Sequence, residues 1–148
     1  MAIRKILRGN DPALTKKSRP VERFDARLAQ LLDDMAQTMR AAEGCGLAAV
    51  QVGVLKRVAV IDCGDGLLEL VNPEIIGREG AQKAPEGCLS FPGEYFTTLR
   101  PAVVRVKAQN RCGQWCFYKA DGIKARAFCH EIDHLNGVLF KTHMVQEG

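Results

Sequence analysis

The chain lacks the long apolar run that a membrane span requires. Such a span needs roughly 20 consecutive apolar residues, and no stretch of the 148 residues approaches that length. The basic start also lacks the apolar core and the small-residue cleavage site of a secretory signal. We therefore expect a cytoplasmic protein with no membrane partner.

The six cysteines include no C-x-x-C pair. This absence removes most structural zinc patterns. No secretory signal is visible, and the chain is long enough to fold without disulfide bonds. We therefore expect the cysteines to be reduced thiols. Cys112 and Cys116 flank a predicted hairpin, and we interpret them as small core residues.

The charge is uneven, and no nucleic-acid-binding motif accompanies its basic part. Residues 1–27 hold eight Lys and Arg against three acidic residues, whereas the remainder of the chain sums to −1. A basic segment helps a protein approach nucleic acid or a ribosome surface, but a solvated surface is the simpler interpretation. We expect no DNA partner.

No repeat, low-complexity tract or linker divides the chain. Apolar residues make up 47% and charged residues 26%, which is an ordinary balance for a globular domain. A chain of this length buries one substantial core. We therefore expect a single domain over residues 1–148.

Two helices and several short strands are predicted. Apolar residues recur at helical spacing from Asp25, a suitable N-cap, to Ala42, and Gly44 ends this N-terminal helix. Extended segments are predicted at residues 54–62, 67–72, 75–76, 85–93, 103–108 and 115–119, and the last two form a hairpin. A second helix runs over residues 122–136. The fold class is therefore α+β, with short antiparallel strands and sheets around the second helix.

The segment Gly44–Gly53, GCGLAAVQVG, is too small and too rich in glycine for an ordinary strand. Such a segment lets backbone groups approach another molecule or chain segment closely. A turn alone explains the glycines, but it does not explain Gln51, a polar residue among apolar neighbours.

The second helix carries the sequence His-Glu-Ile-Asp-His at residues 130–134. Residues four apart project side by side from a helix, so His130 and His134 are placed to bind one divalent metal. Glu131 lies beside such a metal, where a base for a metal-bound water belongs. The alternative is a chance pair of core histidines, against which the position of Glu131 argues.

This helix is expected to be enclosed by other elements. Its apolar residues fall on two opposite sides: Ile123 and Ala127 beside the histidines, and Ala125, Phe128, Ile132 and Leu135 across from them. A carboxylate on an enclosed helix needs a cationic partner. We predict that Asp133 pairs with Arg100 or Arg105.

The third metal ligand is not downstream at the spacing that zinc proteases use. The longer pattern H-E-x-x-H-x-x-G-x-x-H matches through Gly137, but Phe140 occupies its last position, and His143 and Glu147 lie outside that spacing. Upstream, Cys88 lies in an extended segment bounded by prolines, where a thiolate is presented rigidly. A Cys-His-His site with an open position suits Zn²⁺ or Fe²⁺.

Three separated motifs, GCGLAAVQ (44–51), EGCLS (86–90) and HEIDH (130–134), occur in one order along the chain. With them the chain resembles the bacterial peptide deformylases over nearly its whole length. The resemblance implies a hydrolase that removes the N-formyl group from the initiator formyl-methionine of nascent polypeptides and releases formate. It also implies a metal, natively Fe²⁺ and replaceable by Zn²⁺, Ni²⁺ or Co²⁺, bound by Cys88, His130 and His134.

The resemblance also assigns the remaining roles. Glu131 is the general base and acid for attack by a metal-bound hydroxide. The Gln51 side-chain amide and the Leu89 backbone N–H stabilise the oxyanion, and Gly46 aligns the peptide in the manner of a strand. The residues next to these positions are expected to contact substrate as well: Cys45, Glu86 and Gly87.

Some positions depart from the family pattern. Cys45 replaces the usual Ile or Val, Val50 replaces Pro, Cys129 replaces a frequent Gln, and Tyr95 stands where many members have Arg. The C-terminal helix of longer members is missing, so ribosome docking through such a helix is unsupported, although a transient ribosome association and a monomeric state fit the family. The alternatives are a zincin-type endopeptidase and a noncatalytic metal-binding or ribosome-associated relative.

Overall fold

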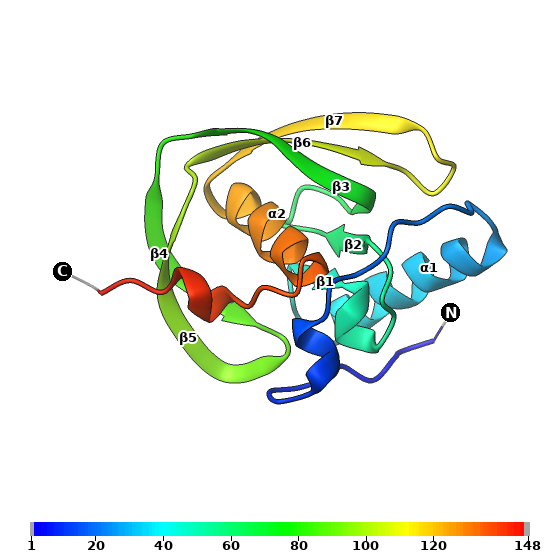
Figure 1. Cartoon of the computed structure of the whole chain (residues 1–148), viewed down its shortest axis with the longest axis horizontal. Coiled ribbons are helices and arrows are strands. Elements are labelled where there is room, and N and C mark those ends of the chain that lie inside the picture. The colour runs from blue at the N-terminus through cyan, green and yellow to red at the C-terminus, as the bar shows by residue number, and fades with distance from the viewer. Residues whose placement is uncertain (1, 147–148) are drawn as a thin grey trace.

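Helix α2 (Gly122–Leu135) lies at the centre of an α+β fold, with the strands curving around it (Figure 1). The computed structural model describes residues 2–146. Among these residues, no helix has the length and apolar character needed to cross a membrane. The α+β class predicted from the sequence is confirmed.

The N-terminal helix α1 (Ala26–Ala41) forms as predicted. Asp25 is its N-cap, and its carboxylate accepts a hydrogen bond from the Leu28 N–H at 3.1 Å. At the other end the Gly44 N–H donates to the Met39 carbonyl at 3.0 Å, which terminates the helix. Its apolar stripe is buried against the sheet, because Leu32, Met35 and Met39 are fully buried.

Five antiparallel strands form the main sheet, in the order β1-β2-β3-β6-β7. They are β1 (Gly46–Ala48), β2 (Val58–Ile61), β3 (Leu68–Glu79), β6 (Val103–Gln109) and β7 (Trp115–Asp121). The predicted hairpin of β6 and β7 is confirmed. β1 lies at one edge of the sheet, so one side of its backbone is not paired within the sheet.

β3 is one strand where the sequence predicted two, over residues 67–72 and 75–76. Its pairing with β6 shifts register between Val71 and Glu74, where Asn72 has φ +51°. The Asn72 side chain binds both the N–H and the carbonyl of Val21, at 2.8 and 3.0 Å. These bonds hold the irregular backbone, so the strand continues past Pro73 with a bulge.

A separate hairpin of β4 (Gln82–Cys88) and β5 (Phe91–Arg100) covers another side of the molecule. It includes the predicted extended segment, with Leu89 and Ser90 at its turn. After α2, the 3₁₀ helix η3 (Phe140–His143) contacts β5, and the Val145 N–H donates to the Thr97 carbonyl at 2.9 Å.

The glycine-rich segment differs in part from the prediction. Gly46–Ala48 does form a strand, and the chain then turns into the 3₁₀ helix η2 (Ala49–Val52), which Gly53 ends at φ +83°. Strand β2 is shorter than the predicted 54–62, because residues before Val58 connect η2 to the sheet. Near the N-terminus, a further 3₁₀ helix η1 covers Pro12–Thr15.

The core lies on both faces of the main sheet. Alternate residues of β2 point to opposite sides: Val58 and Val60 pack in the cluster that contains α1, whereas Ala59 and Ile61 pack in the cluster that contains α2. All four are fully buried. The edge of the sheet formed by β1 and β2 is therefore held between the two helices, which fixes the glycine-rich segment next to α2.

Candidate active site and metal centre

Helix α2 presents the two histidines from a buried position, as predicted. His130 and His134 are 7% and 1% exposed. Arg126 and Cys129, which lie between the two apolar sides of the helix, are buried as well. The expectation for Ile123 is wrong: it is 72% exposed, because the first turn of the helix projects beyond the strands. The enclosed part of the helix therefore begins one turn later.

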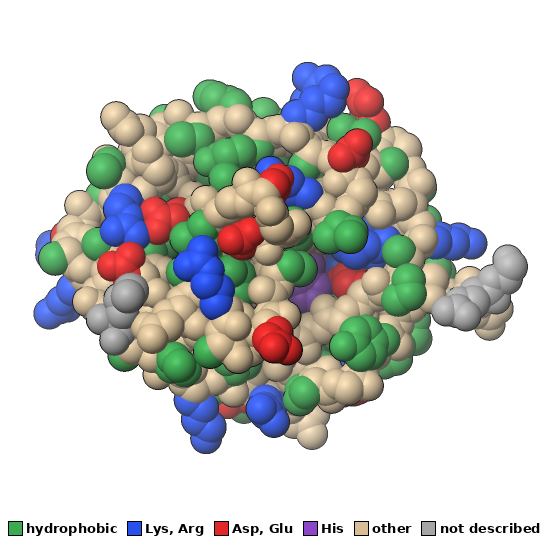
Figure 2. Space-filling view, turned by 180° about the vertical axis from the view of Figure 1, so that it is seen from behind, with side chains coloured by type: hydrophobic (Ala, Val, Ile, Leu, Met, Phe, Trp, Pro, Cys, Tyr) green, Lys and Arg blue, Asp and Glu red, His purple; other side chains and the backbone are tan. Residues whose placement is uncertain are grey.

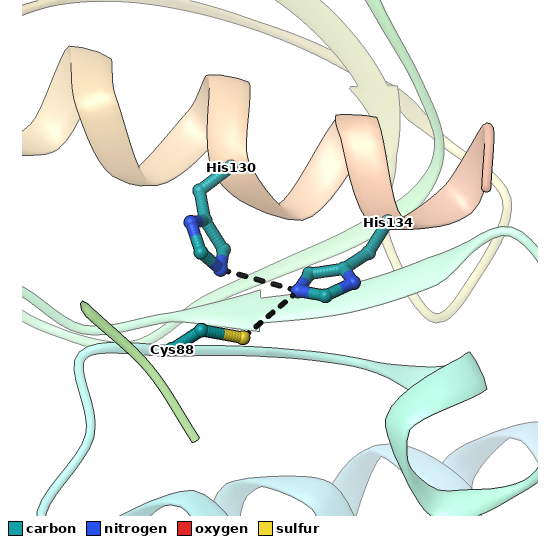
Figure 3. Close-up of side chains that lie close together, drawn as sticks. All are labelled: Cys88, His130 and His134. Atoms are coloured by element: carbon teal, nitrogen blue, oxygen red, sulfur yellow. Dashed lines mark hydrogen bonds between the residues drawn. The ribbon is translucent and has the colours of Figure 1, made fainter. Parts of the chain in front are cut away.

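Three ligand atoms converge at this position. The Cys88 Sγ lies 3.3 Å from the His134 Nε2, and the His134 Nε2 lies 3.1 Å from the His130 Nε2 (Figure 3). All three atoms are within 4.8 Å of one another. Cys88 comes from the end of β4, so the hairpin supplies one ligand and the helix supplies two. This is a Cys-His-His set of the kind that binds a transition metal.

Glu86 fixes the orientation of the His130 ring. Its Oε2 lies 2.6 Å from the His130 Nδ1, so the Nδ1–H donates to the carboxylate and the Nε2 faces the other ligands. Burial opposes a charge on His130, but Glu131, Cys88 and Glu86 outweigh it and hold its pKa well above the usual value. Burial and the neighbouring His130 hold the pKa of His134 well below its usual value.

Glu86 itself is bound by two arginines. Arg100 makes a two-pronged contact, from Nε to Oε1 at 3.0 Å and from Nη2 to Oε2 at 2.7 Å. Arg126 Nη1 donates to Oε1 at 3.0 Å, and Thr98 Oγ1 donates to the same atom at 2.8 Å. Burial alone raises a carboxyl pKa, but the bonds from His130 and Arg100 hold that of Glu86 far below its usual range.

The predicted ion pair of Asp133 is present, with Arg100 as the partner. Arg100 Nη1 lies 2.6 Å from Asp133 Oδ2, and His143 Nε2 lies 3.0 Å from the same oxygen. Arg100 therefore joins Asp133 on α2 to Glu86 on β4. Of the downstream residues weighed as ligands, His143 lies in this network rather than in the metal cluster, and Glu147 lies outside the described residues.

Glu131 carries a polar atom that the rest of the described chain does not satisfy. Its side chain is buried, and no group among residues 2–146 forms a hydrogen bond to its Oε1. The other oxygen lies over Gly46, where an added Cβ would be 2.4 Å from Oε2. Burial raises the pKa of Glu131 to about 7, so the group exchanges a proton near neutral pH.

Gln51 is oriented by bonds at both ends of its amide. Its Oε1 accepts from the Ala48 N–H at 2.9 Å, which turns the Nε2 towards Ser90 Oγ at 3.1 Å and Cys88 Sγ at 3.7 Å. Leu89 follows Cys88 directly, and its side chain fits against Gly44, where a Cβ would lie 2.6 Å from it. The Gln51 amide and the backbone after Cys88 thus border the metal cluster.

The remaining predicted substrate contacts occupy different positions. Gly46 and the exposed Cys45 lie at the free edge of β1, and Gly87 lies under the ring of Tyr95. Glu86 is 5% exposed and both its oxygens are bound, so its position does not support the substrate contact expected for it. Figure 2 shows a histidine side chain at the bottom of a hollow in the surface.

Three groups that support this site were not predicted from the sequence. They are Ser90, which contacts Gln51, and Thr98 and Arg126, which bind Glu86. A signal was present for Arg126, because a cation on an enclosed helix needs an anion as much as Asp133 needs a cation. Nothing in the sequence pattern marked Thr98.

The chain is similar to known proteins over nearly its whole length. The family model described as "Polypeptide deformylase" matches residues 3–148. The peptide deformylase of Alkaliphilus metalliredigens is 53% identical over 99% of this chain and all of its own length. That of Caldicellulosiruptor bescii is 56% identical over 99% of this chain and 88% of its own length.

Solved structures show the same likeness in three dimensions. The crystal structure of the peptide deformylase from Thermotoga maritima superimposes with a TM-score of 0.96 at 39% identity, over 99% of this chain and all of that one. The Synechococcus elongatus enzyme in complex with actinonin gives 0.92 at 40% identity, over 96% and 79%. The chain therefore belongs to the polypeptide deformylase family of enzymes.

Proposed function

We propose that this enzyme removes the formyl group from formyl-methionine peptides through a metal held by Cys88, His130 and His134, with Glu131 as the proton carrier. One observation carries the proposal. The buried Oε1 of Glu131 has no hydrogen-bond partner among the described residues, and Glu131 is next in the chain to His130, one of the three converging ligands Cys88, His130 and His134. An unpaired buried carboxylate oxygen costs free energy unless a ligand or substrate satisfies it.

The three ligand atoms converge as the ligands of one metal ion would. Two imidazole nitrogens and a thiol sulfur face one point, and a metal bound there would take the place of the proton that the raised pKa of His130 holds between the two nitrogens. With Glu86 accepting from Nδ1, His130 binds through Nε2. The metal that Cys88, His130 and His134 would hold would supply Lewis-acid chemistry, lowering the pKa of a bound water at neutral pH. By the family resemblance we propose Fe²⁺, replaceable by Zn²⁺, Ni²⁺ or Co²⁺.

Glu131 moves the proton in the proposed reaction. As a base it takes a proton when the nucleophile attacks the formyl carbon, and as an acid it returns that proton to the departing amine. Burial raises the pKa of Glu131 above its usual value, which favours the uptake of the proton that the acid step later returns. Because the absence of a Cβ at Gly46 leaves room for Glu131 Oε2, the carboxylate keeps this position only with glycine there.

Gln51 and Leu89 are proposed to bind the oxyanion of the tetrahedral intermediate. The bond from the Ala48 N–H to Oε1 sets the Gln51 amide in advance, so its N–H groups are directed towards Cys88. The Leu89 backbone N–H follows the thiolate ligand in the chain. Loss of one such donor typically costs about 2.7–4 kcal/mol in the transition state.

The edge of β1 is the proposed binding place of the peptide. A peptide that adds to a sheet edge is aligned by backbone hydrogen bonds, which do not depend on its sequence. Gly46 lies at this edge against Glu131, Cys45 immediately precedes it, and Gly87 lies in β4, which also supplies Cys88. We further propose that the chain acts as one domain and as a monomer in the cytoplasm, with transient contact to the ribosome.

The test is formate release from a formyl-methionine peptide by Fe²⁺-loaded protein prepared without oxygen. Glu131→Gln keeps the size of the side chain but removes the proton carrier, so kcat should fall by about 10²–10⁴-fold with the metal content unchanged. Glu22→Gln, an identical change at an exposed position, is the matched control. Equal rates in wild type and Glu131→Gln would contradict the proposal.

A second measurement separates deformylation from a zincin-type endopeptidase. Cys88→Ala removes the only proposed ligand from outside α2, so the bound metal, measured by elemental analysis, should be lost. An endopeptidase with a ligand elsewhere would retain its metal in this variant.

A further inference from the structure

Two cysteine side chains, Cys45 and Cys63, meet at the rim of the proposed peptide-binding edge. Cys45 immediately precedes β1, and Cys63 follows β2 by two residues. The thiols are close enough to affect each other's pKa through a side-chain hydrogen bond. Cys45 is exposed and Cys63 is partly exposed, so small molecules in solution have access to the pair.

The backbone fixes this proximity. Gly46 pairs with Ile61 across β1 and β2, and the Asp62 N–H donates to the Cys45 carbonyl at 2.9 Å. Cys45 therefore lies opposite Asp62, and Cys63 is the next residue along. Cys63 is thus a diagonal neighbour of Cys45, one residue beyond the directly opposed position, and a disulfide between them requires Cα atoms within about 7 Å.

The pair is also coupled to the active site. Cys45 is adjacent to Gly46, which contacts Glu131, and the charges of Glu131 and His130 both act on the Cys45 thiol. A covalent bond that draws Cys45 towards Cys63 therefore acts on the backbone that aligns the peptide. No step proposed for the deformylation itself uses either thiol.

We propose that Cys45 and Cys63 form a reversible disulfide that weakens peptide binding at the edge of β1. The oxidant is a low-molecular-weight disulfide of the glutathione type. The Cys45 sulfur attacks it to form a mixed disulfide, and one small thiol leaves. The Cys63 sulfur then attacks the mixed disulfide at the Cys45 sulfur, and a second small thiol leaves. The two thiol hydrogens of the protein are carried away by the two small thiols, so the exchange balances.

The surroundings of the thiols set the rates of this exchange. Burial raises the pKa of Cys45, and it raises that of Cys63 to about 11. Thiols of high pKa are poorly ionised at neutral pH and are also poor leaving groups. The bond should therefore form slowly and be reduced slowly, which suits a response to prolonged oxidation rather than to a brief one.

The test uses Ni²⁺-loaded enzyme, because a metal bound by Cys88 keeps that thiol from reacting. One sample is incubated with glutathione disulfide and compared with a sample kept reduced. Digestion without reductant, followed by mass spectrometry, should give a peptide that joins Cys45 to Cys63. The KM for the formyl-methionine peptide should rise about two- to tenfold, the range for losing one hydrogen bond. Dithiothreitol should reverse both changes.

Matched variants identify the bond that is responsible. Cys63→Ser should keep the basal rate, form no joined peptide and lose the rise in KM. Cys112→Ser removes another exposed thiol and should respond as wild type does. Absence of the joined peptide, or a joined peptide with an unchanged KM, would overturn the inference. The effect on KM depends on the proposed function, but the joined peptide does not, so a protein that forms the bond yet releases no formate would contradict the proposed function alone.

Discussion

Helices α1 and α2 are the two long helices of this protein, and they are buried in different ways. α1 turns one apolar stripe to the sheet, with Leu32, Met35 and Met39 fully buried. α2 is enclosed on most of its circumference, and its buried residues include charged and polar groups: Arg126, His130, Glu131 and His134. α1 also buries Asp34 and Thr38, but its remaining buried residues are apolar, whereas α2 buries four charged or polar side chains that each need a partner.

Because of this difference, we expect substitutions in the two helices to destabilise the protein by different amounts. Apolar contacts are non-directional, so a substitution on α1 costs the contacts that it removes. The charges beside α2 are linked through shared partners, since Glu86 binds Arg100, Arg126 and His130 together. Removal of one charge there leaves others buried without compensation, which costs more than the pair contributes when intact. We expect α2 to be the more sensitive helix in both stability and activity.

The strongest test of the difference is Glu86→Gln. It keeps the shape of the side chain but removes the anion that two buried arginines and His130 share. The free energy of unfolding should fall by about 3–5 kcal/mol, measured by urea denaturation. Metal affinity should fall by about 10–100-fold, because His130 loses the group that orients it. A variant as stable as wild type would show that this network does not hold α2.

Leu32→Ala examines the apolar side of the comparison. Leu32 is fully buried on α1, so its truncation should lower the free energy of unfolding by about 2–5 kcal/mol. The metal content and the kcat of the folded fraction should not change, because Leu32 packs in the apolar cluster of α1 and is not one of the proposed metal ligands, proton carriers or oxyanion donors. Leu99→Ala, at an exposed position, is the control and should have little effect. A loss of kcat in Leu32→Ala would contradict the separation of the two helices.

The stability difference between wild type and Glu86→Gln should depend on pH. The folded state holds the pKa of Glu86 below its ordinary value of 4.5. Its contribution is therefore fully present above about 4.5 and is lost as the pH falls towards the folded pKa. The difference in stability between wild type and Glu86→Gln should accordingly narrow below about pH 4.5. If the difference is instead constant down to pH 3, the charge of Glu86 is not what stabilises the fold.

The smallest expected effect comes from the helix caps. Asp25 accepts from the Leu28 N–H, whereas Asp121, the N-cap of α2, makes no side-chain bond of this kind. Asp25→Ala should therefore cost about 0.5–2 kcal/mol of stability, and Asp121→Ala should cost less. Thermal unfolding of the two variants measures the loss of stability in each. Equal costs would show that the local bond at Asp25 contributes nothing beyond the charge of the residue.

The sequence predicted α1 and the β6–β7 hairpin well because local signals decide both. A cap, an apolar stripe and a stop signal define α1, and alternation with a turn defines the hairpin. β3 was predicted as two strands because Pro73 suggests a break. What keeps the strand continuous is the Asn72 side chain, which binds Val21, 51 residues away in the chain. Such a contact has no local signature.

In the site, too, the features with a local sequence signal were predicted and those that depend on distant contacts were not. His130, Glu131 and His134 were identified from helical spacing alone, and the convergence of Cys88 with the two histidines agrees with the ligand set expected from the sequence. Glu86 was expected at the substrate, and the structure places its carboxylate behind His130 instead. Which side of a β-strand faces the metal is set by the packing of the β4–β5 hairpin against α2, not by the motif in which the residue lies.

Residue types and helical spacing were enough to predict which atoms are able to bind a metal and carry a proton. The groups that support those atoms were visible only in the folded chain. The fold joined Glu86, Arg100 and Asp133 into one network, and it brought Cys45 and Cys63 together at the edge of β1. The physical reason is that burial makes an unpaired charge costly, so the groups that satisfy it come from whichever strand the fold brings close.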